Sequence, residues 1–280
     1  MAQAVTPKRV LVLHGYTQNA SIFGKRIGAL RKTLGKSVEL VFVDAPVILR
    51  PADLVETFGS TADLGAAEAT PDADDPALTP RAWWKTDASR TRTGGLLESV
   101  EVLRDILKAG RFDGVFGFSQ GAAMAAILAA LLERPHLFPP FLIDGAAPHP
   151  PFTFCIAASG FKPAGEFAAR VFEGGYETPT LHVIGRNDVI VIEERSRSLV
   201  DVSKNARVEM HDGGHFVPSK ANWRNFFKLY LLDPLGNVPG PSELPASGAA
   251  TPAGNGIATP SGTATPAEVA EPAPAGKAAL

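Results

Sequence analysis

The stretch Gly114-Val-Phe-Gly-Phe-Ser-Gln-Gly-Ala-Ala-Met124 joins a short apolar run to an alanine-rich run at a single serine. Residues 114–118 have the composition of a buried β-strand, and residues 120–132 are rich in the helix formers Ala and Leu. The pentapeptide Gly117-Phe-Ser-Gln-Gly121 has the G-x-S-x-G form, whose glycines let a strand and a helix meet closely at a strained turn. We therefore predict a nucleophile elbow with Ser119 at its tip. The competing interpretation is a plain turn in which this serine only caps the helix.

Working outward, short β-branched or aromatic runs alternate with longer runs of helical period. The runs that predict strands are 9–13, 38–43, 114–118, 152–157, 181–184 and 206–210. The runs that predict helices are 20–34, 96–107, 120–132, 193–202 and 221–232. Several strands are apolar on both faces, which is typical of strands covered by helices on two sides. The alternation predicts an α/β fold with a doubly wound, mostly parallel sheet of about six strands flanked by helices.

Two regions break this alternation. Residues 50–79 are rich in Ala, Asp, Pro and Thr without sustained periodicity, and they are too long for an ordinary connection. We interpret them as an irregular excursion. Residues 236–280 consist mostly of Ala, Pro, Gly, Ser and Thr and offer too little apolar surface to offset the entropy of ordering. We therefore expect one folded domain over residues 1–235, followed by a disordered tail.

The composition of the chain indicates which kinds of partner and which cellular compartment to expect. The formal net charge is −2, which gives no electrostatic reason to expect a nucleic acid or an anionic membrane as partner. Cys155 is the only cysteine and lies in an apolar run, so we predict a buried structural thiol in a reducing compartment rather than a nucleophile. No run approaches the ~20 apolar residues of a membrane span, and the first residues do not form a signal peptide. We expect a cytoplasmic protein without a membrane span.

A serine hydroxyl needs an adjacent base to act as a nucleophile near neutral pH. Among six histidines, His215 stands in the glycine-rich turn Asp212-Gly-Gly-His-Phe-Val-Pro218 after the last predicted strand. In folds that carry the nucleophile on a turn between a strand and a helix, the histidine base comes last in chain order. His211 is the rival, but it continues the strand end and lacks the flexible turn.

The third member of such a site is an acid that orients the histidine. Asp188 follows the strand at 181–184 in a turn that contains glycine, and it lies between the serine and the histidine in chain order. Asp144 precedes a strand and belongs to the wrong end of the sheet, whereas Asp212 is close to His215 in sequence. The alternative for Asp188 is a turn or helix-capping residue.

An oxyanion hole needs two backbone N–H groups. One is expected from Gln120, directly after the serine, and the other from Tyr16 in the loop after the first strand, where His14-Gly15 lets the backbone turn in closely. The alternative is that this loop only connects a strand to a helix. Trp83 and Trp84 could line an acyl pocket, and a place in the core is equally compatible with the sequence. No metal-ligand pattern or phosphate loop is present, so we expect neither metal nor cofactor.

Together these motifs resemble the family of serine hydrolases common in fungi (FSH), whose animal relative is the ovarian-cancer-associated hydrolase. The resemblance spans residues 8–232 and rests on six segments in family order: Leu11-Val-Leu-His-Gly-Tyr-Thr-Gln-Asn19, Val43-Asp-Ala-Pro46, Arg81-Ala-Trp-Trp84, Gly117-Phe-Ser-Gln-Gly121, Gly185-Arg-Asn-Asp188 and Gly213-Gly-His-Phe-Val-Pro218. It implies the α/β-hydrolase fold with a triad on Ser119, Asp188 and His215. Some members are esterases, and others are thioesterases that release polyketides from a synthase.

The function expected from the residues and the resemblance is hydrolysis of a carboxylic ester or thioester through an acyl-enzyme intermediate. The resemblance extends this expectation to a role in fungal secondary metabolism, such as polyketide release, with an acyl carrier or a synthase enzyme as partner. The alternative from another class is a ligand-binding module that keeps the hydrolase shell without turnover.

Overall fold

The computed structural model describes residues 6–50, 53, 76–85 and 93–245. Their centre is a six-stranded sheet in the order β2-β1-β5-β6-β7-β8, in which every neighbouring pair is parallel. The strands are β1 (Lys8–Leu13), β2 (Val38–Val43), β5 (Gly114–Phe118), β6 (Phe154–Ala158), β7 (Thr180–Gly185) and β8 (Ala206–His211). The prediction of a doubly wound parallel sheet is confirmed.

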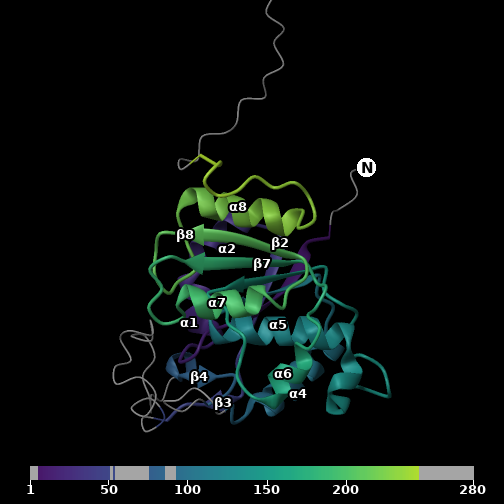
Figure 1. Cartoon of the computed structure of the whole chain (residues 1–280). Coiled ribbons are helices and arrows are strands. Elements are labelled where there is room, and N and C mark those ends of the chain that lie inside the picture. Colours follow the sequence, from purple (N-terminus) through teal and green to yellow (C-terminus); the bar gives the residue numbers. More distant parts are fainter. Residues whose placement is uncertain (1–5, 51–52, 54–75, 86–92, 246–280) are drawn as a thin grey trace, which may run out of the picture. The chain divides into compact units, whose positions relative to one another are not determined.

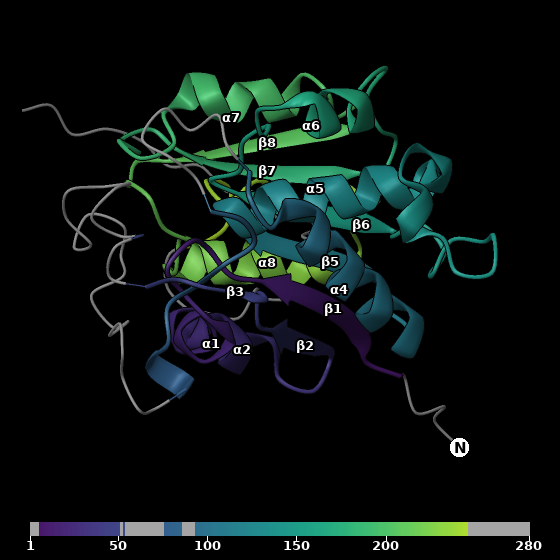
Figure 2. The same ribbon diagram turned by 90° about the horizontal axis from the view of Figure 1, so that it is seen from below.

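Helices cover both faces of this sheet. One face carries α1 (Ala20–Arg26), α2 (Gly28–Leu34) and α8 (Ala221–Leu232), and the other carries α4 (Leu96–Ala109), α5 (Gln120–Glu133), α6 (Glu166–Val171) and α7 (Glu193–Val200). Figure 1 shows α8 on one side of β7 and β8, with α5 and α6 on the other. Figure 2 shows β2 and β8 at opposite edges. Alternate residues of each central strand enter one core or the other, as the period of two in a strand requires.

The structure differs from the predicted elements in a few places. The expected helix 20–34 is two helices: α1 ends at Arg26, Ile27 lies between the helices, and α2 begins at Gly28, a weak helix former. Several short elements were not predicted, because their periodicity is too brief to read from the sequence. These are α6, the antiparallel pair β3 (Val47–Ile48) and β4 (Arg81–Ala82), and the 3-10 turns η2 (Pro76–Leu78), η3 (Pro135–Leu137) and η4 (Pro139–Phe141).

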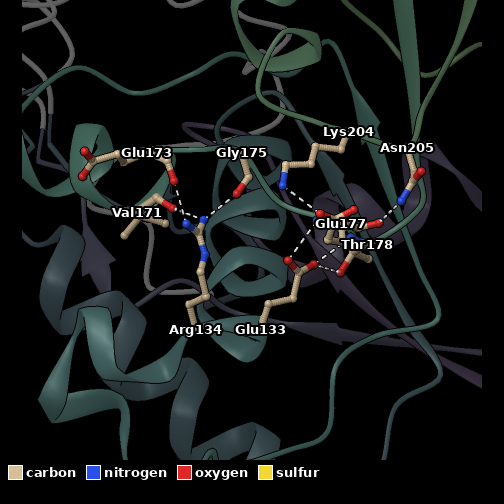
Figure 3. A network of polar contacts seen from close by, with 9 residues as sticks. All are labelled: Glu133, Arg134, Val171, Glu173, Gly175, Glu177, Thr178, Lys204 and Asn205. Carbon is tan, nitrogen blue, oxygen red and sulfur yellow. Dashed lines mark hydrogen bonds and ion pairs between the residues drawn. The ribbon is translucent and has the colours of Figure 1, made fainter.

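Helix α5 follows Ser119, and its far end is anchored by two charged side chains (Figure 3). The Glu133 carboxylate accepts hydrogen bonds from the Glu177 N–H at 2.8 Å and from the N–H and hydroxyl of Thr178 at 2.6 Å each. The Arg134 guanidinium donates to three carbonyl oxygens, those of Val171, Glu173 and Gly175. These bonds tie α5 to the chain that leads into β7.

The two irregular regions are only partly described. Asn19 joins the end of the excursion to α1, because its amide donates to the carbonyls of Ala77 and Thr79 while its oxygen caps the helix at the Ile22 N–H. Residues 236–245 were expected in the tail, yet they lie in the folded part: Val238 joins the core beneath α8. The folded part thus extends about ten residues beyond position 235. Residues 51–52, 54–75 and 246–280, and the disorder expected of the tail, lie outside the described residues.

Candidate active site

Ser119 occupies the tight turn between β5 and α5. Its backbone has φ 53° and ψ −118°, a left-handed conformation that is strained for a residue with a side chain. The Ser119 N–H holds the turn by donating to the Ala158 carbonyl at 2.8 Å. A Cβ atom at Gly117 would lie 2.1 Å from the Gly121 oxygen, and one at Gly121 would lie 2.2 Å from the Leu13 oxygen. Only glycine fits at these two positions, as the pentapeptide predicts.

Three side chains that are remote in sequence meet beside this turn. Oγ of Ser119 lies 2.9 Å from Nε2 of His215, and Nδ1 of His215 lies 2.7 Å from Oδ2 of Asp188. Asp188 follows β7 and His215 lies beyond β8, so all three lie at the carboxyl ends of parallel strands. The imidazole and carboxylate side chains are only 8% and 1% exposed. With Nδ1–H donated to the carboxylate, Nε2 faces the serine hydroxyl as an acceptor.

The environment of Asp188 favours its charged form. Burial by itself raises the pKa of this carboxyl, but the hydrogen bond and charge of His215 and the Val191 N–H outweigh it and hold the pKa below its usual value. Oδ1 accepts hydrogen bonds from the N–H groups of Ile190 at 3.0 Å and Val191 at 2.8 Å. The carboxylate is therefore ionised near neutral pH and held in one orientation toward the imidazole.

The histidine loop is positioned by the loop after β7. The Asn187 N–H donates to the Gly213 carbonyl at 3.1 Å, and its side-chain amide donates to the Asp212 carbonyl at 2.7 Å. The ring of His215 also packs against Phe118, with centroids 4.9 Å apart. These contacts hold the imidazole above the elbow.

The competing residues of the sequence analysis lie elsewhere. Nδ1 of His211 accepts from the Gly213 N–H at 3.2 Å, and its ring packs against Trp223. The Asp212 side chain is 94% exposed and pairs with Arg186. Asp144 lies in the turn that precedes β6, before the amino end of that strand. Thus Ser119, Asp188 and His215 are the residues that the structure brings together.

The loop after β1 lies next to the elbow, because β1 and β5 are neighbouring strands. Gln120 is the first residue of α5, and the N–H groups of the first helical turn have no acceptor within the helix. In the β1 loop, Thr17 has φ 65°, and the Gly15 N–H donates to the side-chain oxygen of Gln18 at 3.1 Å. The assignment of the Gln120 and Tyr16 N–H groups to an oxyanion hole stays a prediction.

His14 supports this loop in a way that sequence reasoning missed. Its Nε2 accepts from the Ala45 N–H at 3.0 Å, so the proton lies on Nδ1, which donates to the Gly15 carbonyl at 2.8 Å. Burial lowers the pKa of His14 to about 4, so the ring is neutral near pH 7. The only available signal is that His14 comes directly after an apolar strand, a position that is equally compatible with a simple turn.

Trp83 and Trp84, the predicted pocket residues, belong to the hydrophobic core. Trp83 has no exposed surface, and its indole N–H donates to the His14 carbonyl at 2.8 Å. Trp84 is 3% exposed and packs edge to face on Phe161. Trp83 thus contacts the β1 loop from within the core. The assignment of Trp83 and Trp84 to a pocket stays an untested prediction.

No group of three or more His, Cys, Asp or Glu side chains in the described part of the chain is gathered as a metal site requires. No described helix is long and apolar enough to cross a membrane. Cys155 is fully buried, and burial raises the pKa of its thiol to about 12, which keeps it protonated as expected of a structural cysteine.

Known proteins match most of this chain. Residues 1–227 match the family model described as serine hydrolase (FSH1). The chain is 38% identical over 239 residues to the esterase OVCA2 of Danio rerio, covering 81% of this chain and 98% of that protein. It is 31% identical over 252 residues to the esterase CG5412 of Drosophila melanogaster, covering 87% and 80%.

Solved structures resemble the chain in fold at low identity. The acyl-protein thioesterase 2 of Zea mays superposes with a TM-score of 0.52 at 16% identity, covering 84% of this chain and 97% of that one. The esterase PE8 superposes with a TM-score of 0.50 at 20% identity, covering 81% and 94%. The resemblance inferred from the motifs is thereby confirmed: this chain has the α/β-hydrolase fold and belongs to the serine hydrolase (FSH1) family.

Proposed function

We propose that the chain hydrolyses carboxylic esters or thioesters through an acyl-enzyme on Ser119, with His215 as general base and Asp188 as the orienting acid. The proposal rests on one observation, the continuous path of two short hydrogen-bond distances from the serine hydroxyl through the imidazole to the carboxylate. A hydroxyl at the tip of a strained turn, beside a buried and oriented imidazole, is the arrangement that activates a serine.

In the acylation half, Nε2 of His215 takes the proton of Ser119 as Oγ attacks the substrate carbonyl carbon. The imidazolium then gives that proton to the leaving alkoxide or thiolate as its bond to the carbonyl carbon breaks. Asp188 stabilises the transient imidazolium, because its carboxylate is buried and is held ionised by the depressed pKa.

In the deacylation half, His215 takes a proton from water, and the resulting hydroxide attacks the acyl carbon. Collapse of the second tetrahedral intermediate returns the proton to Oγ and releases the carboxylic acid. We assign the N–H groups of Gln120 and Tyr16 to the oxyanion in both halves. Preorganised donors at that position are commonly worth about 10²–10³ in kcat each.

The surroundings of the site favour an apolar acyl group. Val189 and Ile192 are 81% and 47% exposed just after Asp188, and Phe216 is 47% exposed just after His215. Apolar side chains left open beside reactive groups are typical of a binding surface. An ester and a thioester can carry the same acyl group to this surface, and this includes a thioester held by an acyl-carrier partner in polyketide release.

The test compares Ser119→Ala and His215→Ala with two matched controls at exposed positions, Ser37→Ala and His136→Ala. Purified variants are assayed on p-nitrophenyl esters and on acyl thioesters of several chain lengths, and all are treated with a fluorophosphonate probe. We expect turnover and labelling of the wild type and both controls, and loss of turnover to background in the first two variants. Comparison of the ester and thioester series then assigns the preferred leaving group.

Two results would contradict the proposal. Normal turnover by folded Ser119→Ala protein would assign the chemistry to another nucleophile. Folded wild-type protein that forms no fluorophosphonate adduct and hydrolyses no member of the panel would favour the ligand-binding module instead.

A further inference from the structure

The segment 81–84, which begins as strand β4, bridges the two loops that carry the proposed oxyanion donors. On one side, the Arg81 N–H donates to the Gln18 carbonyl at 3.0 Å, and the Trp83 indole N–H donates to the His14 carbonyl at 2.8 Å. On the other side, the Trp83 backbone N–H donates to Oε1 of Gln120 at 2.7 Å. The segment is therefore bonded both to the β1 loop and to the residue that follows Ser119.

Trp83 lies at the centre of this bridge, and its backbone N–H, its indole N–H and its carbonyl each make a hydrogen bond. Its carbonyl accepts a hydrogen bond from the Ser99 hydroxyl on α4, and its side chain has no exposed surface. The amide of Gln120 completes the clamp by donating to the Trp84 carbonyl at 2.9 Å. A residue so buried and bonded has one conformation, so it acts as a rigid spacer between the two loops.

The spacer reaches the two loops close to the proposed donors. Gln120 bears one donor on its own backbone, and its side chain is the part that Trp83 and Trp84 hold. The His14 carbonyl belongs to the peptide bond before Gly15, and the next peptide carries the Tyr16 N–H. A rotation of the first peptide changes the direction of the second, because they share the backbone of one glycine.

We propose that Trp83 is a positioning residue for the oxyanion hole: its indole N–H and its backbone N–H together set the separation between the Tyr16 and Gln120 donors. This inference rests on the proposed function, because it concerns the hole of that same site. Without the indole N–H, the buried His14 carbonyl loses this donor, and an unpaired buried carbonyl turns toward any other donor in reach. The Tyr16 N–H then leaves the position in which it meets the developing charge.

The principal test is Trp83→Phe, which keeps an aromatic ring in the core and removes the indole N–H. We expect kcat to fall about tenfold, less than the ~10²–10³ of a deleted donor, because the Tyr16 N–H is displaced rather than absent. KM should change by less than about threefold, since the donors act on the transition state and not on the bound ester. A trifluoromethyl ketone, whose adduct with Ser119 bears an oxyanion, should bind more weakly by the same factor as the loss in kcat.

The matched control is Trp223→Phe on α8, which makes the same substitution at a buried position outside the bridge. We expect its kcat to stay within about twofold of wild type. Rates are divided by the concentration of active protein, titrated with the fluorophosphonate, so a misfolded fraction does not enter kcat. Site-specific incorporation of benzothienylalanine at position 83, which replaces only the N–H by sulfur, covers the case in which Trp83→Phe folds poorly.

The proposal is overturned if both substitutions at position 83 leave kcat and inhibitor affinity at wild-type values, or if KM rises while kcat is unchanged. Either result is compatible with a working triad, provided that the wild type is labelled and Ser119→Ala is inactive. Failure of the proposed function gives a different pattern, in which the Ser119→Ala protein itself keeps its activity.

Discussion

Acidification should destabilise the protein through imidazoles that are buried in the folded chain. His182 lies on β7 with 2% exposure, and its buried Nε2 has no hydrogen-bond partner among the described residues. Burial lowers the pKa of His182 from an ordinary value of 6.5 to about 4. Because the unfolded chain binds more protons between these two pH values, the free energy of unfolding falls as the pH falls from 6.5 and levels off below about 4.

The size of this effect follows from the two pKa values. Each pH unit in the interval is worth about 1.4 kcal/mol, so His182 accounts for up to ~3 kcal/mol over the full interval and for ~2 kcal/mol between pH 7 and pH 5. A typical domain has only about 5–15 kcal/mol of stability in total. The pKa of His14, which is also lowered to about 4 by burial, adds a loss of the same sign.

The substitution His182→Leu isolates one of these groups, because it removes the titration and fills a similar volume. Urea unfolding is followed at pH 7, 6 and 5, and the wild type should lose ~2 kcal/mol more than the variant between pH 7 and pH 5. The control is Val183→Ala on the same strand, whose cavity lowers stability by a similar amount at every pH. Parallel curves for wild type and His182→Leu would refute the reasoning.

Three further predictions concern the elbow, the anchor of α5 and the acid. Gly117→Ala places a Cβ atom 2.1 Å from the Gly121 oxygen, so we expect the free energy of unfolding in urea to fall by ~3 kcal/mol and fluorophosphonate labelling to be lost. The control Gly28→Ala, with open space around its Cβ atom, should keep wild-type stability and labelling. Glu133→Ala removes three accepted hydrogen bonds and should lower the free energy of unfolding by ~2–3 kcal/mol with kcat unchanged; a loss below ~0.5 kcal/mol would contradict this. Asp188→Asn should lower kcat by about 10³–10⁴, as the comparable change does in serine proteases, and a loss below tenfold in steady-state assays would assign the orienting role elsewhere.

Most of the sheet could be predicted because each strand is specified by residues that are neighbours in the sequence. Each buried strand is a short apolar run that ends at a turn, and the parallel order follows from the helices between the strands. The meeting of positions 119, 188 and 215 could be predicted for the same reason, since each follows a strand and parallel strands end at one edge. Their catalytic roles are the part that the proposed experiments test.

The bridge through Trp83 could not be predicted from the sequence. Its hydrogen bonds join residues 37 and 69 positions apart, and no pattern of hydrophobicity or spacing encodes which carbonyl an indole N–H will reach. The composition of the segment suggested instead two aromatics near a pocket. The break between α1 and α2 was missed for a different reason, because the apolar period continues across it.

The order of the strands has a consequence for how reactivity arises during synthesis. The serine motif is translated long before β8, the edge strand after which the histidine comes. A nascent chain or a proteolytic fragment that stops short of this edge carries the complete pentapeptide and still lacks His215, the proposed base. Under the proposed mechanism, reactivity toward a fluorophosphonate should therefore report that the last strand has joined the sheet, and it could serve as a probe of complete folding.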